Sequence, residues 1–354
     1  MDAAIMTAAQ QLLGRELAGG WRVIEQLVRP LDTSGGAFST GYIVQNQDGR
    51  RGFLKALDYS KAFTDPNIPV SIALQRLAET INHEKFVLGR CRDRNLDRIV
   101  ISIADGTLDV GGPGLGTVEY FIFELADSDV RKHMGTINRL DIIWRLRCLH
   151  HVATGLQQLH SNDIVHQDVK PSNILVFNGQ SQKIADLGRS SCVGQFPPHS
   201  ALAFAGDRTY APPDILFRFS FGEKRARDLS VDAYMLGSMV VYLFMDMPMT
   251  PLLLSELPPE YRDWTVFSGS VDEIQPHLAS AFLRVLESLR HHVTSDLKDD
   301  ICSIVSQLCE PDPSRRGHPA QREGSHQQFA LNRYVTKFDL LARRAHARAL
   351  GISR

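Results

Sequence analysis

The stretch His166-Gln167-Asp168-Val169-Lys170-Pro171-Ser172-Asn173-Ile174-Leu175 decides the fold, because it holds three chemically distinct groups at short, fixed spacings. The carboxylate of Asp168, the ammonium of Lys170 and the carboxamide of Asn173 occupy offsets 0, +2 and +5. A second carboxylate opens the tripeptide Asp186-Leu187-Gly188, thirteen residues after Asn173. A single His-x-Asp triplet would be common by chance, whereas this joint spacing is specific.

Each of these groups suits one part of a phosphoryl transfer from a nucleotide that binds magnesium. Asp168 can accept the proton of an attacking alcohol, and Lys170 can neutralise charge on the moving phosphoryl group. Asn173 and Asp186 offer hard oxygen ligands to Mg²⁺, which prefers oxygens and keeps some of its waters. The same oxygen ligands suit Mn²⁺.

With this spacing, residues 166–175 resemble the catalytic loop of the protein kinase family, in its serine/threonine branch, and residues 186–188 resemble the family's magnesium-binding tripeptide. The resemblance implies an α+β, two-lobed fold. A small β-rich N-lobe with one main helix would precede a larger, mainly helical C-lobe. The resemblance spans roughly residues 21–318. The build is similar to that of compact stand-alone kinases of bacteria.

Composition sets wide bounds on the function. A chain of 354 residues with net charge −1 can build two lobes and has no overall field that would draw it onto nucleic acid or an anionic membrane. Five cysteines without framework spacing favour a reduced, cytoplasmic setting. The apolar run Ala233–Met245 is too short to span a bilayer, and the N-terminus lacks the pattern of a signal peptide.

Hydrophobic periodicity predicts the elements. Strands are expected at Trp21–Leu27, Gly41–Gln45, Gly52–Leu57, Arg98–Ile103 and Val118–Glu124. Helices are expected at 2–18, 71–92, Leu140–His160, Ser230–Phe244, Asp272–His291, Leu297–Leu308 and Arg333–Leu350. A glycine-rich run at 105–116 lacks the strand-turn-helix context of a nucleotide fingerprint, so we interpret it as a hairpin loop. A β-rich first third followed by helices is typical of an α+β fold.

These elements suggest five parts of the chain. The expected parts are an N-terminal helical extension at 1–20, an N-lobe at 21–123, a hinge at 124–129, a C-lobe at 130–318 and a basic helical tail at 319–354. For the tail, a solvated face packed on the C-lobe is favoured over a nucleic-acid-binding surface.

The resemblance also suggests where a nucleotide would bind. Residues 34–42 look like the glycine-rich loop that covers phosphates, with small side chains that let backbone amides come close. The residues assigned to this loop are Ser34, Gly35, Gly36, Ala37, Phe38 and Ser39. The match is partial, because two serines stand where glycines are usual and Gly41 replaces the valine that packs over the base. An ordinary hairpin turn is the alternative.

Lys55 resembles the strand lysine that binds the first two phosphates and pairs with a helix glutamate. Glu84 is the expected partner and Glu79 the alternative, since helical periodicity cannot place both on the inward face.

The residues Phe123-Glu124-Leu125-Ala126 look like the hinge of the family. The backbone of Glu124 and Ala126 would then read the adenine edge, and Phe123 would border the pocket behind it. Either Asp127 or Asp129 would bind the ribose.

By the same resemblance, the activation segment is expected from Arg189 to Ala205 and ends at residues 206–214. Asp214 would anchor this segment by pairing with Arg316, and Asp232 would hold the catalytic-loop backbone. Two departures from the family stand beside Asp168. Gln167 replaces a common arginine and has no charge to bind a phosphate on the activation segment. Asp207 replaces a usual threonine, so a cation such as Lys170 is expected between the two carboxylates.

The residues together suggest an ATP-dependent protein kinase that acts on serine and threonine hydroxyls of protein substrates and phosphorylates itself. Two alternatives stay open: a pseudokinase that serves as a binding module, and a small-molecule kinase of the aminoglycoside phosphotransferase type. The full set of charged groups speaks against the first, and Lys170 with the Asp214/Arg316 pair speaks against the second. No nucleic-acid partner and no membrane span are expected.

Overall fold

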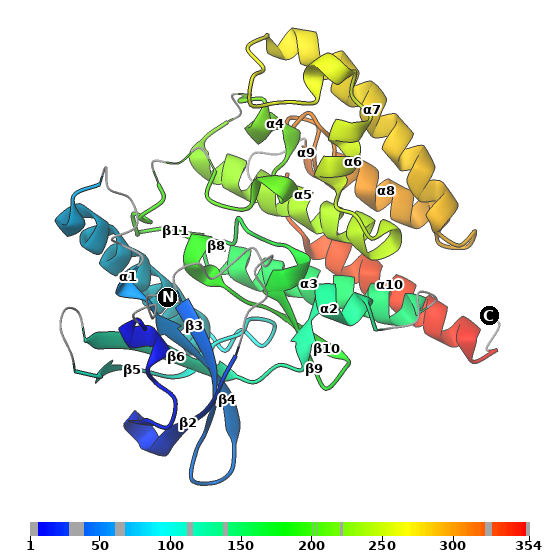
Figure 1. The fold of residues 1–354 in the computed structure, drawn as a ribbon. Coiled ribbons are helices and arrows are strands. Elements are labelled where there is room, and N and C mark those ends of the chain that lie inside the picture. Colours follow the sequence, from blue (N-terminus) through cyan, green and yellow to red (C-terminus); the bar gives the residue numbers. More distant parts are fainter. Residues whose placement is uncertain are drawn as a thin grey trace, which may run out of the picture. The chain divides into compact units, whose positions relative to one another are not determined.

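The computed structural model describes residues 6–27, 39–60, 68–111, 116–136, 141–200, 202, 204–219, 222–322 and 328–351. The chain divides into two compact units, one of residues 1–95 and 100–127 and the other of residues 96–99 and 128–354. The first unit is built around an antiparallel sheet and the second is mainly helical (Figure 1). The mixed α+β fold predicted from the sequence is therefore confirmed.

The first unit contains a six-stranded antiparallel sheet in the order β1-β2-β3-β4-β6-β5. Its strands are β1 Glu16–Leu17, β2 Trp21–Gln26, β3 Ser39–Gln45, β4 Arg51–Leu57, β5 Ser102–Asp109 and β6 Thr117–Glu124. Because side chains alternate along each strand, the two faces of the sheet have different compositions. The long helix α1 (Val70–Asp93) belongs to the same unit.

One face of this sheet covers the hydrophobic core of the first unit. Its buried members include Tyr42, Leu54 and Ile122 from three neighbouring strands. The other face presents the alternate residues, among which Phe53 and Lys55 are only partly buried. The second face therefore leaves side chains such as Lys55 accessible to a ligand. The first face supplies the packing that keeps the sheet rigid.

The predicted helix at 2–18 is wrong for the residues that the structure describes. A short 3₁₀ helix at Ala8–Gln10 is followed by a turn at Gly14, whose φ of 79° is unfavourable for a helix, and then by β1, which pairs with β2. Leu12 is fully buried in the sheet core, and the hydroxyl of Tyr42 donates a 2.7 Å hydrogen bond to Ala9 O. The segment thus completes the sheet core instead of forming a separate helical extension.

The predicted strand at Arg98–Ile103 is displaced. Residues 96–99 belong to the second unit, where Ile99 forms a single parallel bridge to Ile184, and β5 begins only at Ser102. The predicted hairpin loop at 105–116 is also shorter than expected, because residues up to Asp109 extend β5. The phenol of Tyr120 lies over Gly106 in this strand and excludes a side chain there, since a Cβ at residue 106 would lie 2.5 Å from the phenol oxygen.

The second unit is built from helices around a central apolar one. These are α2 Val130–Met134, α3 Ile142–Ser161, α4 Pro213–Leu216, α5 Lys224–Met245, α6 Met249–Ser255, α7 Val271–His292, α8 Lys298–Leu308, α9 Pro319–Arg322 and α10 Asn332–Ala349. Helix α5 is long and apolar enough to cross a membrane by length and composition, yet 83% of its most apolar window is buried within the protein. That burial is typical of a core helix.

Two small sheets complete the second unit. The strands β9 (Ile174–Phe177) and β10 (Ser181–Ile184) form a hairpin, and β7 (Ser128–Asp129) pairs with β9. The other sheet pairs β8 (Ile164–Val165) with β11 (Ser191–Cys192). The chain from residue 166 to residue 190 runs between β8 and β11 and contains the β9–β10 hairpin, so the predicted catalytic stretch begins directly after β8 and ends in the first residues of β9.

The basic C-terminal helix α10 packs along α3. Its basic side chains also form ion pairs with two aspartates on or just before α8. Lys337 Nζ lies 2.7 Å from Asp300 Oδ1, and Arg344 Nη1 lies 2.9 Å from Asp300 Oδ2. Arg348 pairs with Asp296. Partial burial acts to raise the pKa of Asp300, but the hydrogen bonds and charges of Lys337 and Arg344 together outweigh it and hold this pKa below its ordinary value. Part of the basic charge of the tail is therefore neutralised within the unit.

The packing of the N-terminal segment can be tested with two adjacent leucines. Leu12 is fully buried, whereas Leu13 is 58% exposed. We expect Leu12→Ala to lower the free energy of unfolding of the first unit by about 2–5 kcal/mol, because it leaves a cavity in the sheet core. Leu13→Ala should change it by less than about 0.5 kcal/mol. Urea titration followed by amide hydrogen exchange in β2 and β3 measures both, and equal effects of the two substitutions would contradict the packing.

Candidate active site

The β9–β10 hairpin determines where the second carboxylate lies. Its register places Ile174 opposite Ile184, so the residues just before β9 and just after β10 meet. The amide of Ala185 donates a 2.8 Å hydrogen bond to Asn173 O. The next residue, Asp186, adopts a left-handed conformation with φ of 63°, which aspartate tolerates better than most residues. Asp186 therefore directly follows a residue whose backbone is hydrogen-bonded to Asn173.

Asp168 lies at the centre of a buried cluster of polar groups. Lys170 Nζ is 3.0 Å from Asp168 Oδ2, and Asn173 Nδ2 donates to the same oxygen at 3.0 Å. The backbone amide of Asp207 donates to Asp168 Oδ1 at 2.8 Å. Lys170 Nζ also lies 3.5 Å from Asp207 Oδ2. The cation predicted between the two carboxylates is therefore present.

Burial is the largest influence on the pKa of Asp168, and it raises that pKa above the ordinary value for aspartate. Lys170, the amide of Asp207 and His166 act in the opposite direction but do not cancel the effect. A carboxylate with a raised pKa is a better proton acceptor than an ordinary one, provided that the pH keeps it ionised.

The backbone of the catalytic stretch is held by the buried carboxylate of Asp232. Its Oδ2 accepts a 2.8 Å hydrogen bond from the amide of His166, and its Oδ1 accepts one of 2.7 Å from the amide of Gln167. The ring Nε2 of His160 lies 2.8 Å from Oδ2. Gln167 has a positive φ of 63°, and the bonds to Asp232 hold its backbone in this strained conformation.

His166 and His160 were given no role in the sequence analysis. His166 Nδ1 accepts a 3.2 Å hydrogen bond from the amide of Asp168, and its Nε2 lies 3.1 Å from Ala185 O. One imidazole therefore connects the backbone amide of Asp168 with the carbonyl of Ala185, the residue before Asp186. The position of His166 inside the motif could have suggested this role, whereas His160 has no comparable signal in the sequence.

In the first unit, Lys55 on β4 meets Glu84 on α1. Lys55 Nζ lies 2.7 Å from Glu84 Oε1 and 3.0 Å from Oε2, so both carboxylate oxygens are engaged. Glu84 is buried and Lys55 partly exposed. The alternative Glu79 instead accepts a 2.8 Å hydrogen bond from Gln75 Nε2 on the exposed side of the helix. The structure thus brings Lys55 together with Glu84.

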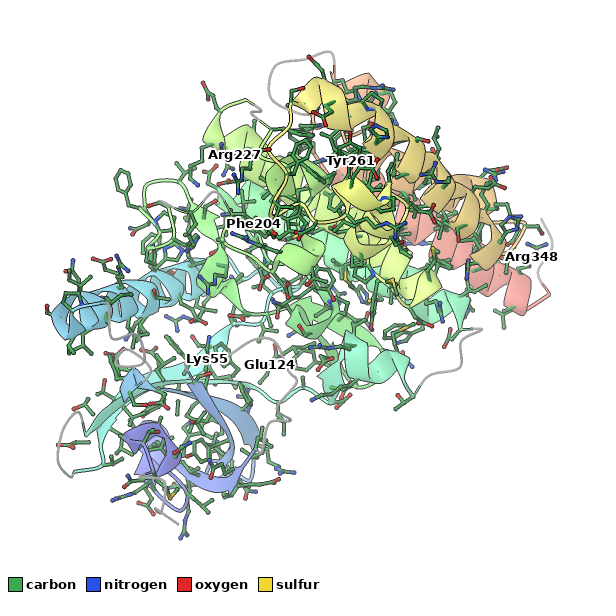
Figure 2. The ribbon with its side chains drawn as sticks, turned by 45° about the horizontal axis from the view of Figure 1, so that its top comes forward. Lys55, Glu124, Phe204, Arg227, Tyr261 and Arg348 are labelled. Carbon is green, nitrogen blue, oxygen red and sulfur yellow. The ribbon has the colours of Figure 1, made fainter. Side chains whose placement is uncertain are left out.

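The other predicted nucleotide-binding residues are placed as follows. Phe123 and Glu124 end β6, and Ala126 follows in the segment where the first unit ends. Figure 2 marks Lys55 and Glu124 in this unit. Asp129 caps α2 by accepting a 3.0 Å hydrogen bond from the amide of Lys132, so it has a structural role whether or not it binds ribose. Ser39 opens β3, while Ser34 through Phe38 lie outside the described residues.

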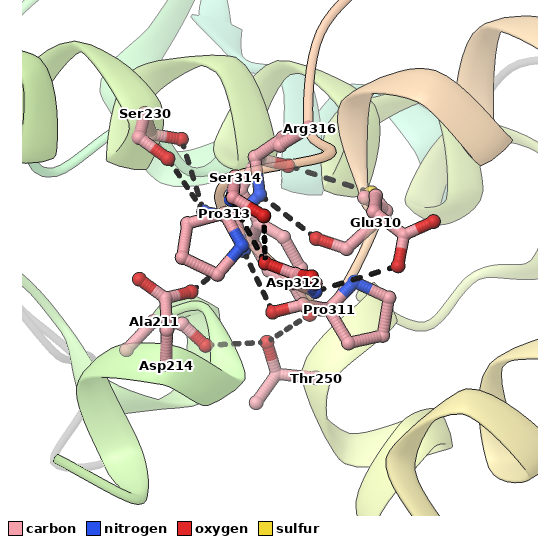
Figure 3. Close-up of polar contacts among 12 residues, drawn as sticks. Ala211, Asp214, Ser230, Thr250, Glu310, Pro311, Asp312, Pro313, Ser314 and Arg316 are labelled. Atoms are coloured by element: carbon pink, nitrogen blue, oxygen red, sulfur yellow. Dashed lines mark hydrogen bonds and ion pairs between the residues drawn. The ribbon is translucent and has the colours of Figure 1, made fainter. Parts of the chain in front are cut away.

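A buried ion pair anchors the chain that follows the catalytic stretch (Figure 3). Arg316 Nη2 lies 2.6 Å from Asp214 Oδ1, and both side chains are almost fully buried. The guanidinium also donates to Ser230 Oγ at 2.8 Å and to Glu310 O at 2.9 Å. Its remaining hydrogen-bonding capacity is thus used, which offsets much of the cost of burying the charge. The structure brings together the two residues that the family resemblance paired.

Gly206 was not singled out from the sequence. A Cβ at this position would overlap Gln167 O and would lie 2.7 Å from Phe204 Cζ and 3.2 Å from Asp168 Oδ1. Phe204, labelled in Figure 2, packs beside this point. The chain can approach the catalytic stretch closely enough for Asp207 N to bond Asp168 only because residue 206 has no side chain.

The donors fit a nucleotide-bound divalent cation better than an all-protein metal centre. Within the described ranges, no group of three or more His, Cys, Asp or Glu side chains could hold a metal ion. Asn173 turns its amide nitrogen to Asp168, which leaves its carbonyl oxygen as the available ligand atom. Two oxygen ligands, from Asn173 and Asp186, are what Mg²⁺ typically takes from a protein when phosphates supply others.

The chain is similar to known protein kinases. A model of the protein kinase domain matches residues 74–328, which begins after Lys55 and the glycine-rich stretch. The cyclin-dependent kinase F-3 of Oryza sativa subsp. japonica is 28% identical over 197 residues, 52% of this chain and 42% of that protein. The cell division control protein 2 homolog 3 of Trypanosoma brucei brucei is 28% identical over 239 residues, 66% of this chain and 67% of that protein.

A third relative is the calmodulin-binding receptor-like cytoplasmic kinase 1 of Arabidopsis thaliana, 30% identical over 166 residues. The match covers 45% of this chain and 32% of that protein. The chain thus spans about a third to two thirds of the length of these curated relatives.

Gly206 offers a test of the site geometry. We expect Gly206→Ala to displace Asp207 from Asp168 and to lower any phosphoryl-transfer rate by about 10²-fold or more, because small misplacements of reacting groups are costly. Gly89→Ala is the control, since a Cβ at Gly89 on α1 meets nothing within 4 Å. It should leave the rate unchanged and slightly stabilise the helix. A rate for Gly206→Ala equal to that of the unsubstituted protein would contradict the close approach.

Proposed function

The chain belongs to the protein kinase family, and we propose that it transfers the γ-phosphoryl group of ATP to serine and threonine hydroxyls of protein substrates. The observation that supports this proposal best is the buried cluster around Asp168, in which Lys170 and Asn173 contact its carboxylate directly. We further propose that the protein phosphorylates itself.

In this function, Asp168 accepts the proton of the acceptor hydroxyl. Its Oδ1 is held by the amide of Asp207 and its Oδ2 by Asn173, so the carboxylate is oriented before a substrate arrives. Lys170, which contacts both Asp168 and Asp207, supplies positive charge for the phosphoryl group as it moves. Catalysis then consists mainly of positioning and charge stabilisation.

Lys55 would bind the first two phosphates of ATP, with Glu84 holding its ammonium in position. Asn173 and Asp186 would hold Mg²⁺, or Mn²⁺ in its place. A cation held by these two residues would supply positive charge against the phosphates. The base would be read by backbone groups of Glu124 and Ala126, with Phe123 behind it and Asp129 near the ribose.

The anchored activation segment favours a protein as substrate over a small molecule. Asp214 is fixed by a buried arginine, and the carbonyl of Ala211 accepts a 2.8 Å hydrogen bond from Thr250. A segment that is held at this end can present a defined surface to an extended polypeptide. A purely binding role is disfavoured because the charged groups that chemistry requires keep their mutual contacts.

ATP and a protein bearing serine or threonine acceptors are the proposed partners, with no nucleic acid and no membrane span. A cytoplasmic location is proposed, since five cysteines without the spacing of a disulfide framework are typical of a reducing compartment.

The proposed activity is tested with γ-labelled ATP, Mg²⁺ and the purified chain, beside Asp168→Asn. We expect label on serine or threonine, of the chain itself or of an added protein, at a rate about 10²–10⁴-fold lower in the variant. Nucleotide affinity should be retained, because Asp168 contacts the acceptor and not the nucleotide. Mass spectrometry locates the label. Nucleotide binding without any label would contradict phosphoryl transfer to proteins and favour the binding module.

The pH dependence of the rate tests the environment of Asp168. Since burial raises its pKa, the acidic limb of kcat/KM should lie above the range of an ordinary aspartate. Lys170 lowers this pKa, so Lys170→Met should move the limb of the residual activity to higher pH. Lys183→Met removes a lysine that lies over the ring of Phe177 and should leave the limb in place. An acidic limb that lies at the same or a lower pH in Lys170→Met would contradict the role given to Lys170.

A further inference from the structure

We propose that the ring of Phe53 is the surface on which the purine base of the nucleotide stacks, and that Gly41 is a glycine because this ring occupies the space above it. The proposal rests on the proposed function and specifies how its nucleotide is held. It concerns residues of the first unit alone.

The strand register puts Phe53 on the face of the sheet that carries Lys55. Residues 53 and 55 are two apart in β4, so their side chains point the same way. Across the sheet, Phe53 lies opposite Phe123, and Lys55 lies opposite Phe121 and Gly41. The core side chains of β4 belong to the opposite face. Phe53 is therefore next to Lys55 on the face where the phosphates would bind.

Phe53 also lies on the side of Lys55 that a base would occupy. Going back along β4 from Lys55, the chain passes Phe53 and reaches Gly52, which pairs with Glu124. Lys55 would bind phosphates and Glu124 would meet the base edge. A nucleotide held at these two points would run along β4, with its phosphates at Lys55 and its base towards Glu124. The side chain of Phe53, which lies between these two points, would then face the base.

Of the phenylalanines that the structure describes on this face, Phe53 has the most exposed surface. Phe121 and Phe123 are buried, at 2% and 8% exposure, while Phe53 is only partly buried. The ring of Phe53 lies 6.5 Å from that of Phe123, and Phe123 lies 6.1 Å from Phe121. Phe123 thus packs beside Phe53 on the same face of the sheet, which limits the entropy that Phe53 loses when a ligand contacts it.

The position of the Phe53 ring explains the glycine at 41. A Cβ on Gly41 would lie 3.1 Å from Phe53 Cε2 and 3.4 Å from Phe53 Cζ. The tip of the ring therefore leans over Gly41, and a branched side chain at this position would have to displace the ring. Gly41 does not have a positive φ, so its backbone conformation places no demand for glycine. The missing side chain and the large ring are two parts of one arrangement.

Stacking on the ring of Phe53 would add affinity without distinguishing one base from another. Stacking on a ring is available to every base, since every base has a π-face, and is worth about 1–3 kcal/mol per base when measured by alanine substitution. Phe53 should therefore strengthen the binding of adenine and guanine nucleotides alike. Any preference between them would have to come from hydrogen bonds to the base edge.

The test measures the dissociation constants of the full chain for adenosine and for a non-hydrolysable ATP analogue with Mg²⁺, by titration calorimetry. We expect Phe53→Ala to weaken both complexes by about 5- to 150-fold. Phe53→Leu, which keeps apolar bulk but no π-face, should lose most of that affinity. Lys55→Met should weaken the analogue and spare adenosine, because it removes a phosphate contact only.

The pairing of Phe53 with Gly41 is tested by a double-mutant cycle. Gly41→Val should displace the ring and weaken adenosine binding about as much as Phe53→Ala. In Gly41→Val/Phe53→Ala the valine fills the vacated space, so the combined loss should be clearly smaller than the sum of the two. Melting temperatures of all variants show whether the first unit remains folded.

The outcomes separate this proposal from the function on which it rests. Unchanged adenosine affinity in folded Phe53→Ala would overturn the stacking role, while nucleotide binding by the unsubstituted chain would leave the kinase proposal intact. Tighter binding in Phe53→Ala would overturn it too, since the ring would then fill the site of the base. If the unsubstituted chain binds neither adenosine nor the analogue, the proposed function itself is wrong.

Discussion

The three hydrogen bonds that Asp232 accepts are the constraint on which the site in the second unit depends. Without a fixed acceptor, the amides of His166 and Gln167 would be buried and unpaired, which costs about 1–3 kcal/mol for each group. With Asp232 in place, Gln167 keeps its left-handed conformation and the chain turns so that Asp168 meets Lys170 and Asn173. A fully buried carboxylate on the central helix therefore defines the shape of the loop that would do the chemistry.

The same helix fixes two further segments. Ser230 of α5 accepts a hydrogen bond from Arg316, which holds Asp214. Asp228 accepts a 2.9 Å hydrogen bond from Ser191, which lies five residues after Asp186. Asp228 and Asp232 are four residues apart and share one face of the helix, while Ser230 lies on another. Burial raises the pKa of Asp228, so its carboxylate is held at a cost that Lys224 and Ser191 partly offset. One rigid element thus positions the catalytic loop and both ends of the segment that follows it.

Much of this arrangement could be predicted from the sequence, because it depends on short spacings. The offsets from Asp168 to Lys170 and Asn173 require only a local turn, and the structure places all three in contact. Long-range pairs such as Lys55 with Glu84 and Asp214 with Arg316 were predicted from a family resemblance, since no spacing in the chain implies them. The N-terminal segment could not be predicted in this way. Its apolar residues fit a helix by periodicity, but burial of Leu12 against the sheet outweighs that local preference.

The glycines show most clearly what the sequence leaves open. A positive φ often explains why a position is glycine, yet Gly41, Gly106 and Gly206 are not among the residues with positive φ in this structure. Another part of the chain crowds or occupies the place of each missing side chain: the ring of Phe53 lies close to it at Gly41, and the phenol of Tyr120 and the carbonyl of Gln167 overlap it at Gly106 and Gly206. Such crowding depends on a neighbour that is distant in the chain, so no local pattern reveals it. Where a glycine departs from a family's usual residue, the side chain that fills the vacated space is therefore the place to seek a change in function, as Phe53 illustrates beside Gly41.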